Sequence, residues 1–368
     1  MNKKRICFVA QFPPPIHGLS KAVETLYNSE LNEEFDFEKI DIKDNSRIIQ
    51  TLATILKSKA DLFYFTISQS KGGNIRDLII LALLRLQHKE CLIHLHGGYY
   101  RQLVDADMPS WQRKLNYRLI KGLTGAIVLG PSLRNIFEGM LPDDKIFVVP
   151  NCVDNQYLMS DEEFEEKANT LSERKVKHVL YLSNFIRSKG YPFVLEMARL
   201  EKERVEKGKE NKFHFDFAGM FIANSEKEYF ENYIRDNALE DFITYHGIVG
   251  GDTKRGLLKR CDVFVLPTRY PNEGQPISIL EAMGNGMLII STDHAGIPDI
   301  VKAGINGIVI PKNTDAEECF HMMLNQDEQT IMRVERTNRI QVTEMYSQSD
   351  YLKNMEMLFS TAIKGEQK

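Results

Sequence analysis

The chain has 368 residues, a length that suggests two domains of ordinary size. Its composition, 43% hydrophobic and 27% charged, excludes a disordered or fibrous protein. A formal net charge of −4 gives no general electrostatic reason to bind nucleic acid, so we expect none as a partner. The charge is uneven, because residues 1–150 carry 20 Lys and Arg against 16 Asp and Glu, whereas the remainder carries 27 against 35.

The cysteines and the apolar runs bear on where the protein works. Five scattered cysteines without a C-x-x-C pair indicate reduced thiols in a cytoplasmic protein, and they offer no zinc site. The first apolar run, Ile6–Ala10, is too short for a signal peptide. The longest, Leu78–Leu84, is far shorter than the roughly 20 residues of a membrane span. We therefore expect a cytoplasmic protein without a membrane-spanning segment.

Short apolar runs alternate with segments of helical periodicity, which predicts an α/β protein with two doubly wound parallel sheets. The Asn- and Glu-rich stretch Asp154–Lys177 is interpreted as the connection between the two, and Gln341–Ile363 as one or two terminal helices. The predicted strands are Ile6–Ala10, Leu62–Thr66, Leu92–His96, Ala126–Leu129 and Ile146–Val149, then Val179–Leu182, Phe213–Ala218, Ile243–Tyr245, Val263–Leu266, Leu288–Ser291 and Ile308–Ile310.

Ligands of open parallel sheets bind beyond the carboxyl ends of the strands, so the loops there are informative. In Gln11–Ser20, Gly18 and Ser20 precede a predicted helix; they suit either an anion at its N-terminus or a plain turn capped by Ser20. In the second loop, His94 and His96 share one side of a strand. His94 suits a core position, whereas His96 abuts a glycine pair that a substrate could approach.

Two loops of the second half suggest contacts with phosphate. Lys189 beside Gly190 is a candidate phosphate contact, although a solvated surface lysine has the same local sequence. A more permissive loop, Gly247–Gly251, follows a short strand. The richest loop is Pro267–Gly286, where Pro276 suits the first turn of a helix whose N-terminus could hold a phosphate. Glu281 on that helix is either an exposed carboxylate or an acceptor for a pair of ribose hydroxyls.

These loops, in this order, resemble those of the retaining family-four glycosyltransferases. The family has two glutamates eight positions apart, and this chain reads Glu273-Gly-Gln-Pro-Ile-Ser-Ile-Leu-Glu281-Ala-Met. The continuation Ser291–Val301 and the hinge-like Val149-Pro-Asn-Cys-Val-Asp154 are also similar to the family pattern. The resemblance covers residues from about 6 to 315.

The resemblance implies the GT-B fold, two Rossmann-like domains facing a central cleft. The expected acceptor-side domain is 1–155 with a helix of about 344–368, and the expected donor domain is 172–343. It implies catalytic roles for His96, Glu273 and Lys189. Donor-binding roles fall to Gly18, Asn184, Lys189, Val249, Gln275, Pro276, Ile277 and Glu281. No metal or other cofactor is expected, because the lysine and the helix N-terminus would meet the charge of the diphosphate.

Three departures from the family pattern bear on the donor. The family's arginine about five residues before Lys189 is Asn184 here, which leaves Arg187 as the only nearby replacement. The first glycine of the N-terminal loop is His17, and the family's Phe-Gly is replaced by Gln275-Pro276. The substitutions leave the class intact and leave open which nucleotide and sugar are bound.

The expected activity is transfer of a sugar from a nucleotide sugar, with a UDP-sugar as the favoured donor, and with retention of anomeric configuration. The expected acceptor is a glycan or lipid-linked glycan in the biosynthesis of a cell-surface polysaccharide. The alternatives are a nucleotide-sugar epimerase of the same fold and a catalytically silent binding protein. The segment Trp111–Lys121 predicts a basic amphipathic helix, either an ordinary surface helix or a contact with an anionic membrane at the inner leaflet.

Overall fold

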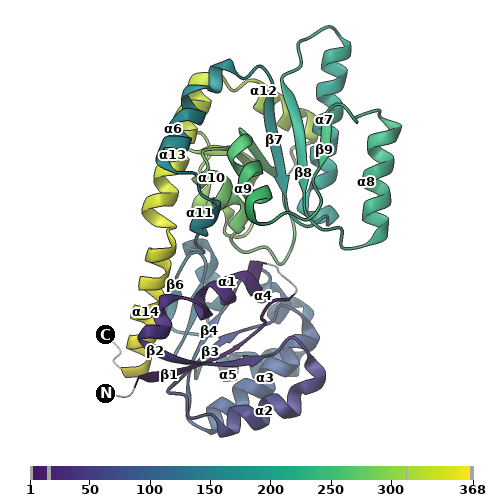
Figure 1. The fold of residues 1–368 in the computed structure, drawn as a ribbon. Helices are drawn as coiled ribbons and strands as arrows, with labels where there is room; N and C mark the ends of the chain where they lie inside the picture. The colour runs from purple at the N-terminus through teal and green to yellow at the C-terminus, as the bar shows by residue number, and fades with distance from the viewer. Residues whose placement is uncertain (1–2, 15–17, 312, 365–368) are drawn as a thin grey trace. The chain divides into compact units, whose positions relative to one another are not determined.

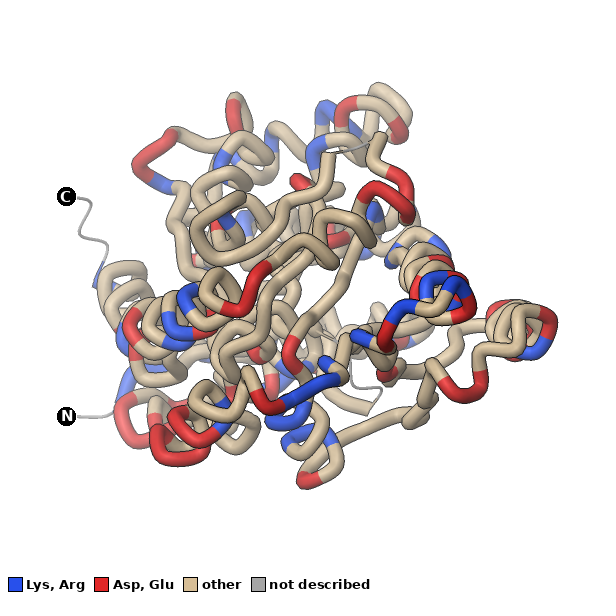
Figure 2. Tube along the Cα trace, turned by 90° about the horizontal axis from the view of Figure 1, so that it is seen from above, with Lys and Arg blue, Asp and Glu red and all other residues tan. Residues whose placement is uncertain are grey.

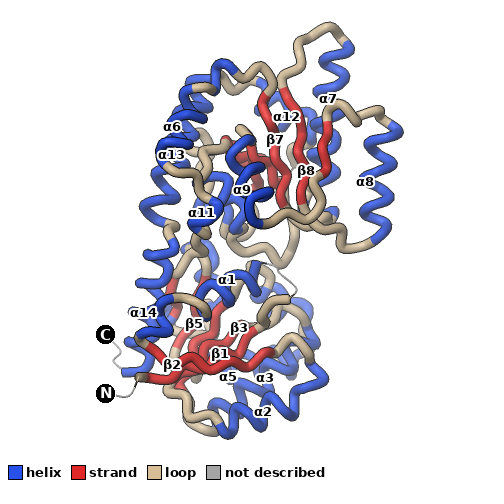
Figure 3. Tube along the Cα trace, viewed as in Figure 1, coloured by secondary structure: helices blue, strands red, loops and turns tan. Residues whose placement is uncertain are grey.

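A computed structural model describes residues 3–14, 18–311 and 313–364. The chain divides into two compact units, and its path crosses between them several times. The first unit contains residues 1–151, 272–275 and 349–368; the second contains 152–271 and 276–348. In each unit, helices and strands alternate along the chain (Figures 1 and 3). Among the described residues, no helix is both long enough and apolar enough to cross a membrane.

The first unit is built on a parallel sheet of six strands, with the order β2-β1-β3-β4-β5-β6 in the described chain. Its central strands are buried on both faces, which explains their nearly continuous apolar runs. The strands are β1 (Lys4–Ala10), β2 (Phe35–Asp41), β3 (Leu62–Thr66), β4 (Glu90–His94), β5 (Gly125–Val128) and β6 (Ile146–Val148).

Helices cover both faces of this sheet. On one face, Phe8 and Tyr64 pack against aromatic rings of α1 (Gly18–Tyr27) and α14 (Gln348–Lys364). On the other face lie α2 (Ile48–Lys57), α3 (Lys71–Leu86) and α5 (Ser110–Ile120), side by side (Figure 1). The short helix α4 (Tyr100–Gln102) follows β4.

The second unit is built on another six-stranded parallel sheet, with the order β12-β11-β10-β7-β8-β9 in the described chain. Its strands are β7 (Lys177–Leu182), β8 (Phe213–Ala218), β9 (Ile243–Tyr245), β10 (Val263–Leu266), β11 (Leu288–Thr292) and β12 (Gly307–Ile310). Its helices are α6 (Asp161–Asn169), α7 (Tyr191–Glu206), α8 (Asn224–Asp236), α9 (Gly251–Arg260), α10 (Ile277–Gly284), α11 (Ile297–Ile300), α12 (Ala316–Leu324) and α13 (Glu328–Met345).

Two parallel sheets flanked by helices confirm the expected α/β class with two doubly wound units, but local details differ. The strand β2 was not predicted; it is an edge strand in which apolar and polar residues alternate. The stretch 154–177 is not a bare connection, because it contains α6, which starts in a capping box between Ser160 and Glu163. Lys167 of this helix donates to the carbonyls of Cys261 and Asn285, at 2.6 and 2.9 Å. The stretch is therefore part of the second unit.

Candidate active site

The second unit has a topological switch point between its neighbouring strands β7 and β10. From β7 the chain continues through β8 and β9 to one side, and it returns with β10, β11 and β12 on the other. The loops after β7 and β10 therefore leave the sheet in opposite directions, which opens a crevice where ligands of such sheets bind. Asn184 and Lys189 lie on the first loop, and Pro276 and Ile277 follow the second.

The loop after β7 is held against the loop after β10. Gly190 has a φ of +87°, and a Cβ there would lie 2.6 Å from the carbonyl oxygen of Pro267. The Arg269 amide donates to the Ser188 carbonyl at 2.6 Å. A side chain at position 190 would thus be strained and would push the loops apart. The glycine beside Lys189 is required by this packing.

Lys189 sits at this junction. Its ammonium lies 5.0 Å from the centre of the Tyr270 ring, a cation–π distance that orients the side chain along the loop after β10. Arg187, the expected replacement for the missing family arginine, instead stacks on Tyr229 at 4.3 Å and pairs with Glu226 of α8 at 3.4 Å. Lys189 is therefore the cation of this loop that the structure holds beside Tyr270.

The helix α10 begins after Pro276, as the sequence predicts, and ends at Gly284. Ile277 is its first residue, so the free amides of its first turn lie at the carboxyl edge of the sheet. Gly286, with a φ of +70°, follows the helix. The N-terminus of α10 can therefore receive an anion, a role that its dipole favours.

Glu281 of α10 is buried, not an exposed helix carboxylate. Its side chain accepts a hydrogen bond from Lys254 of α9 at 2.6 Å. The Lys254 ammonium also lies 4.2 Å from the centre of the Tyr157 ring. Lys254 could not be predicted from the sequence, because nothing in the chain order pairs α9 with α10. The glycine-rich loop that precedes α9 carries Val249, which is half-buried.

In the first unit, His94 and His96 follow one another on β4 and just beyond it. The strand ends at His94, two residues earlier than predicted, and His96 lies in the loop. The two ring centres lie 3.9 Å apart with the ring planes tilted by 32°, and His94 Nδ1 lies 2.7 Å from the Tyr64 hydroxyl. Burial holds the pKa of His94 well below its ordinary value, and the neighbouring His96 lowers it further. His94 is therefore a neutral core residue that supports the ring of His96.

The His96 loop packs against residues 272–275, which belong to the same unit. The Gly98 amide donates to the Glu273 carbonyl at 2.6 Å. A Cβ at Gly97 would lie 2.5 Å from the Asn272 carbonyl oxygen, and a Cβ at Gly274 would lie 2.6 Å from that of His96. These contacts leave no room for side chains at either glycine. The structure thus brings together two segments that the sequence places far apart.

Gln275 forms hydrogen bonds with Asn151 and Leu129 that were not predicted from the sequence. Its side-chain oxygen accepts from the Asn151 amide at 2.7 Å, and its nitrogen donates to the Leu129 carbonyl at 3.0 Å. The Asn151 side chain returns a hydrogen bond to the Gln275 carbonyl at 2.8 Å. Both polar atoms of this buried side chain are engaged in the first unit, so a donor-binding role for it stays a prediction.

The N-terminal loop is described only in part, because residues 15–17, His17 among them, lie outside the described residues. Gly18 is exposed and is the first residue of α1, and Ser20 lies within the first turn of that helix. The prediction that Gly18 precedes the helix is wrong, because Gly18 belongs to α1. Over the described ranges, no group of three or more His, Cys, Asp or Glu is placed to hold a metal ion. Metal independence stays a prediction.

Comparisons with known proteins agree with this architecture. Residues 162–328 match the profile of the family described as glycosyl transferases group 1. The chain is 38% identical over 84 residues, 22% of its length, to the putative colanic acid biosynthesis glycosyltransferase WcaL of Salmonella typhimurium. It is 27% identical over 120 residues, 31% of its length, to the amylovoran biosynthesis glycosyltransferase AmsK of Erwinia amylovora. The matched segments span 21% of WcaL and 30% of AmsK.

A solved structure of HepE from Anabaena, in complex with UDP, has the same fold. It superposes with a TM-score of 0.74 over 97% of this chain and 100% of that chain, at 14% identity. The two six-stranded parallel sheets and this likeness define the GT-B fold. The match of residues 162–328 to the group 1 glycosyl transferase model confirms the resemblance found in the motif of Glu273 and Glu281.

Proposed function

We propose that this protein transfers a sugar from a UDP-sugar to a glycan or lipid-linked glycan acceptor in polysaccharide biosynthesis, with retention of anomeric configuration. The observation that carries the proposal is the placement of Lys189 and the N-terminus of α10 beyond the adjacent strands β7 and β10. A cation and a helix N-terminus at one edge of a sheet suit a diphosphate. The WcaL and AmsK likeness supports a polysaccharide product, and the HepE structures with UDP and UDP-glucose support the nucleotide.

The chemistry follows from the charge that develops as the sugar leaves. The departing UDP gains negative charge, which Lys189 and the α10 dipole stabilise without a divalent metal. Asn184, Val249, Pro276 and Ile277 complete the donor loops of the second unit, and Glu281 is assigned to the ribose. In the first unit, His96 and Glu273 are the proposed catalytic side chains, because their loops are held together by the Gly98 hydrogen bond. The backbone of Gly18 is proposed to help stabilise the departing diphosphate.

Saturation-transfer NMR with UDP-, GDP-, ADP- and dTDP-glucose in the presence of EDTA tests the donor. We expect a strong saturation-transfer signal on UDP-glucose and a weak signal or none on the other three nucleotide sugars. The bound donor is then incubated with the protein, and the anomeric protons are followed over time. Conversion of the nucleotide-linked hexose into a different hexose, still attached to the same nucleotide, would make the protein an epimerase. Binding without any turnover when glycan or lipid-linked acceptors are supplied would favour a silent binding protein, and binding that requires Mn²⁺ would contradict metal independence.

A further inference from the structure

One helical layer of the first unit leaves large apolar side chains in solvent. Helices α2, α3 and α5 lie side by side on one face of the sheet, and neighbours among them are in contact (Figure 1). We call their outward side the α3 surface. Its exposed apolar side chains are Ile49 and Leu56 of α2, Ile75, Ile79 and Leu86 of α3, and Trp111 of α5. Ile49 and Leu86 are about four-fifths exposed, at 80% and 78%. Such a concentration on three adjacent helices indicates a surface that meets a partner.

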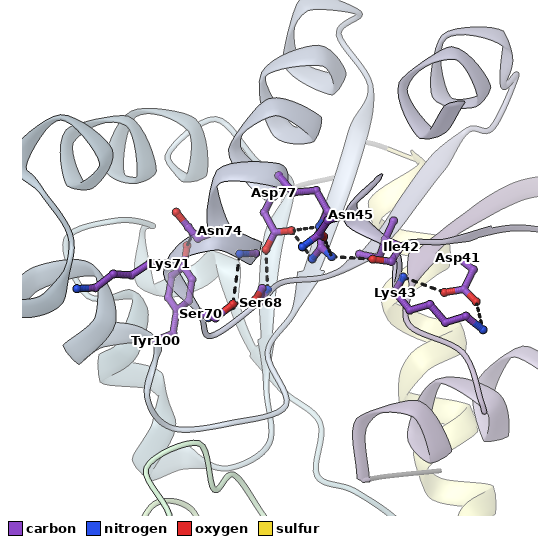
Figure 4. Close-up of polar contacts among 12 residues, drawn as sticks. Asp41, Ile42, Lys43, Asn45, Ser68, Ser70, Lys71, Asn74, Asp77 and Tyr100 are labelled. Atoms are coloured by element: carbon purple, nitrogen blue, oxygen red, sulfur yellow. Dashed lines mark hydrogen bonds and ion pairs between the residues drawn. The ribbon is translucent and has the colours of Figure 1, made fainter. Parts of the chain in front are cut away.

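The rotation of α3 is fixed by polar contacts on its inner side. Arg76, a buried residue, donates to the Ile42 carbonyl at 2.7 Å and to the Asp77 carboxylate. The other oxygen of Asp77 accepts from the Ser68 amide (Figure 4). Breaking such a buried pair is costly, so the helix cannot turn its outer side inward. Ile75, Ile79 and Leu86 recur at the spacing of one helix face and stay outward.

The helix α5 is held in register with α3 by a pair of buried amides. Asn74 and Asn116 exchange hydrogen bonds of 2.9 and 3.0 Å, and Gln112 donates to the Asn74 oxygen at 3.0 Å. These contacts turn Gln112 and Asn116 inward. Trp111, which is 57% exposed, therefore faces the same solvent as the isoleucines of α3.

The charge on this layer has one sign. Over most of the chain, Lys and Arg are interspersed with Asp and Glu (Figure 2). By contrast, α2 and α5 contain no acidic residue, and the one in α3, Asp77, is buried against Arg76. In the described part of the chain, none of the exposed cations here forms an ion pair: Lys57, Lys71, Arg85, Lys114, Arg118 and, at the end of α5, Lys121.

We propose that the α3 surface docks this protein on an anionic membrane. Apolar side chains that enter the boundary between headgroups and acyl chains, with cations among them, suit a negatively charged lipid surface. A second copy of the same surface fits less well, because it would oppose six cations to six cations without an acidic residue between them. The inference goes beyond the proposed function, since it needs neither donor nor acceptor.

The single tryptophan of the chain is a built-in probe, because it lies on the proposed contact. Wild-type protein is mixed with phosphatidylcholine vesicles that contain 0 or about 30% phosphatidylglycerol, at low and high salt, and binding is measured by flotation. We expect flotation and a blue shift of Trp111 emission on anionic vesicles at low salt. We also expect quenching of Trp111 by lipids brominated on the acyl chain, and at least tenfold weaker binding on neutral vesicles.

Two variants and a control assign the binding to this surface. Ile79→Ser with Leu86→Ser removes exposed apolar groups, and Lys114→Gln with Arg118→Gln removes exposed cations. Each pair is expected to weaken flotation at least tenfold while the circular dichroism spectrum stays unchanged. Ile340→Ser with Met345→Ser, exposed apolar positions on α13, is expected to bind like wild type. The donor NMR experiment is unaffected by the apolar pair if the two proposals are independent, as we infer.

Two results would overturn the proposal. The first is equal and negligible flotation of all proteins, with Trp111 emission unchanged by vesicles. The second is a concentration-dependent dimer in sedimentation velocity that the Ile79→Ser and Leu86→Ser pair abolishes, which would make the α3 surface an interface between two copies of this chain.

Discussion

Lys254 Nζ lies 2.6 Å from Glu281 Oε1, with the Glu281 side chain only 4% exposed and that of Lys254 18% exposed. The carboxylate assigned to the donor is thus held by a cation from another helix, which fixes its position before a ligand arrives. The pairing therefore bears both on stability and on the donor binding that we propose for Glu281, and both can be measured.

Lys254→Met should destabilise the protein by about 3 kcal/mol, because it leaves a buried carboxylate without its cation. Chemical denaturation measures the change in the free energy of unfolding. Lys259→Met on the same helix is the matched control, since its pair with Glu163 is more exposed and should contribute less than about 1 kcal/mol. Equal effects of the two substitutions would show that the Lys254 pair is not buried in solution.

Tyr64→Phe should cost about 1–3 kcal/mol of stability, because the buried His94 Nδ1 loses the hydroxyl that lies 2.7 Å away. The measurement is thermal and chemical denaturation, with circular dichroism as the check on folding. Tyr245→Phe serves for comparison, since the ring of Tyr245 is partly exposed and water can replace its hydroxyl. A variant of Tyr64 as stable as wild type would remove the support that we assign to His96.

Gly274→Ala should destabilise the first unit by about 1–3 kcal/mol, because the new Cβ would meet the His96 carbonyl oxygen at 2.6 Å. It should also reduce turnover by moving the His96 loop. Gly72→Ala is the control, as its Cβ meets nothing within 4 Å on a helix, and it should stabilise by about 0.5–1 kcal/mol. If Gly274→Ala proved as stable as wild type, the packing of the two loops would be wrong.

Glu335 of α13 gives the stability a pH dependence. Burial raises the pKa of Glu335 to about 7, while the nearby Lys167 partly opposes the shift. Because the folded pKa lies above the unfolded one, the protein binds a proton more tightly when folded. The contribution of Glu335 is therefore complete at pH 4 and is lost as the pH rises through 7. Glu335→Gln should raise the stability at pH 8 by on the order of 1–3 kcal/mol and leave it nearly unchanged at pH 4. An equal effect at both pH values would contradict this.

The sequence predicted eleven of the described strands because each contains a short run rich in apolar residues, and the central strands are buried on both faces. It did not predict β2, since Phe35, Phe37 and Ile40 alternate with charged residues as an edge strand does. The stretch 154–177 was likewise predicted to be a connection, because the buried side of α6 contains only two apolar residues, Phe164 and Ala168, beside the charged Lys167. Periodicity in so short a helix is weak.

The candidate site residues also fall into two groups, those that the local sequence predicts and those that depend on the folded structure. The positions of Lys189, Pro276 and Glu281 after strands and in a helix were predicted from the local sequence, whereas their roles come from the family resemblance and stay predictions. Lys254 and the engagement of Gln275 with Asn151 were not predicted, because each depends on packing between segments far apart in the chain. No local pattern encodes such pairings, so only the folded structure supplies them.

The central claim, that the second unit binds the diphosphate of a nucleotide sugar through Lys189, is tested most directly by isothermal titration calorimetry with UDP in EDTA. We expect Lys189→Gln to weaken UDP binding by about 1.5–3 kcal/mol, the loss of a charge-assisted contact. Arg187→Gln removes a cation two residues away that is paired with Glu226, and it should bind UDP like wild type. UDP binding that is the same for wild type and Lys189→Gln, or that is lost only in Arg187→Gln, would contradict the account.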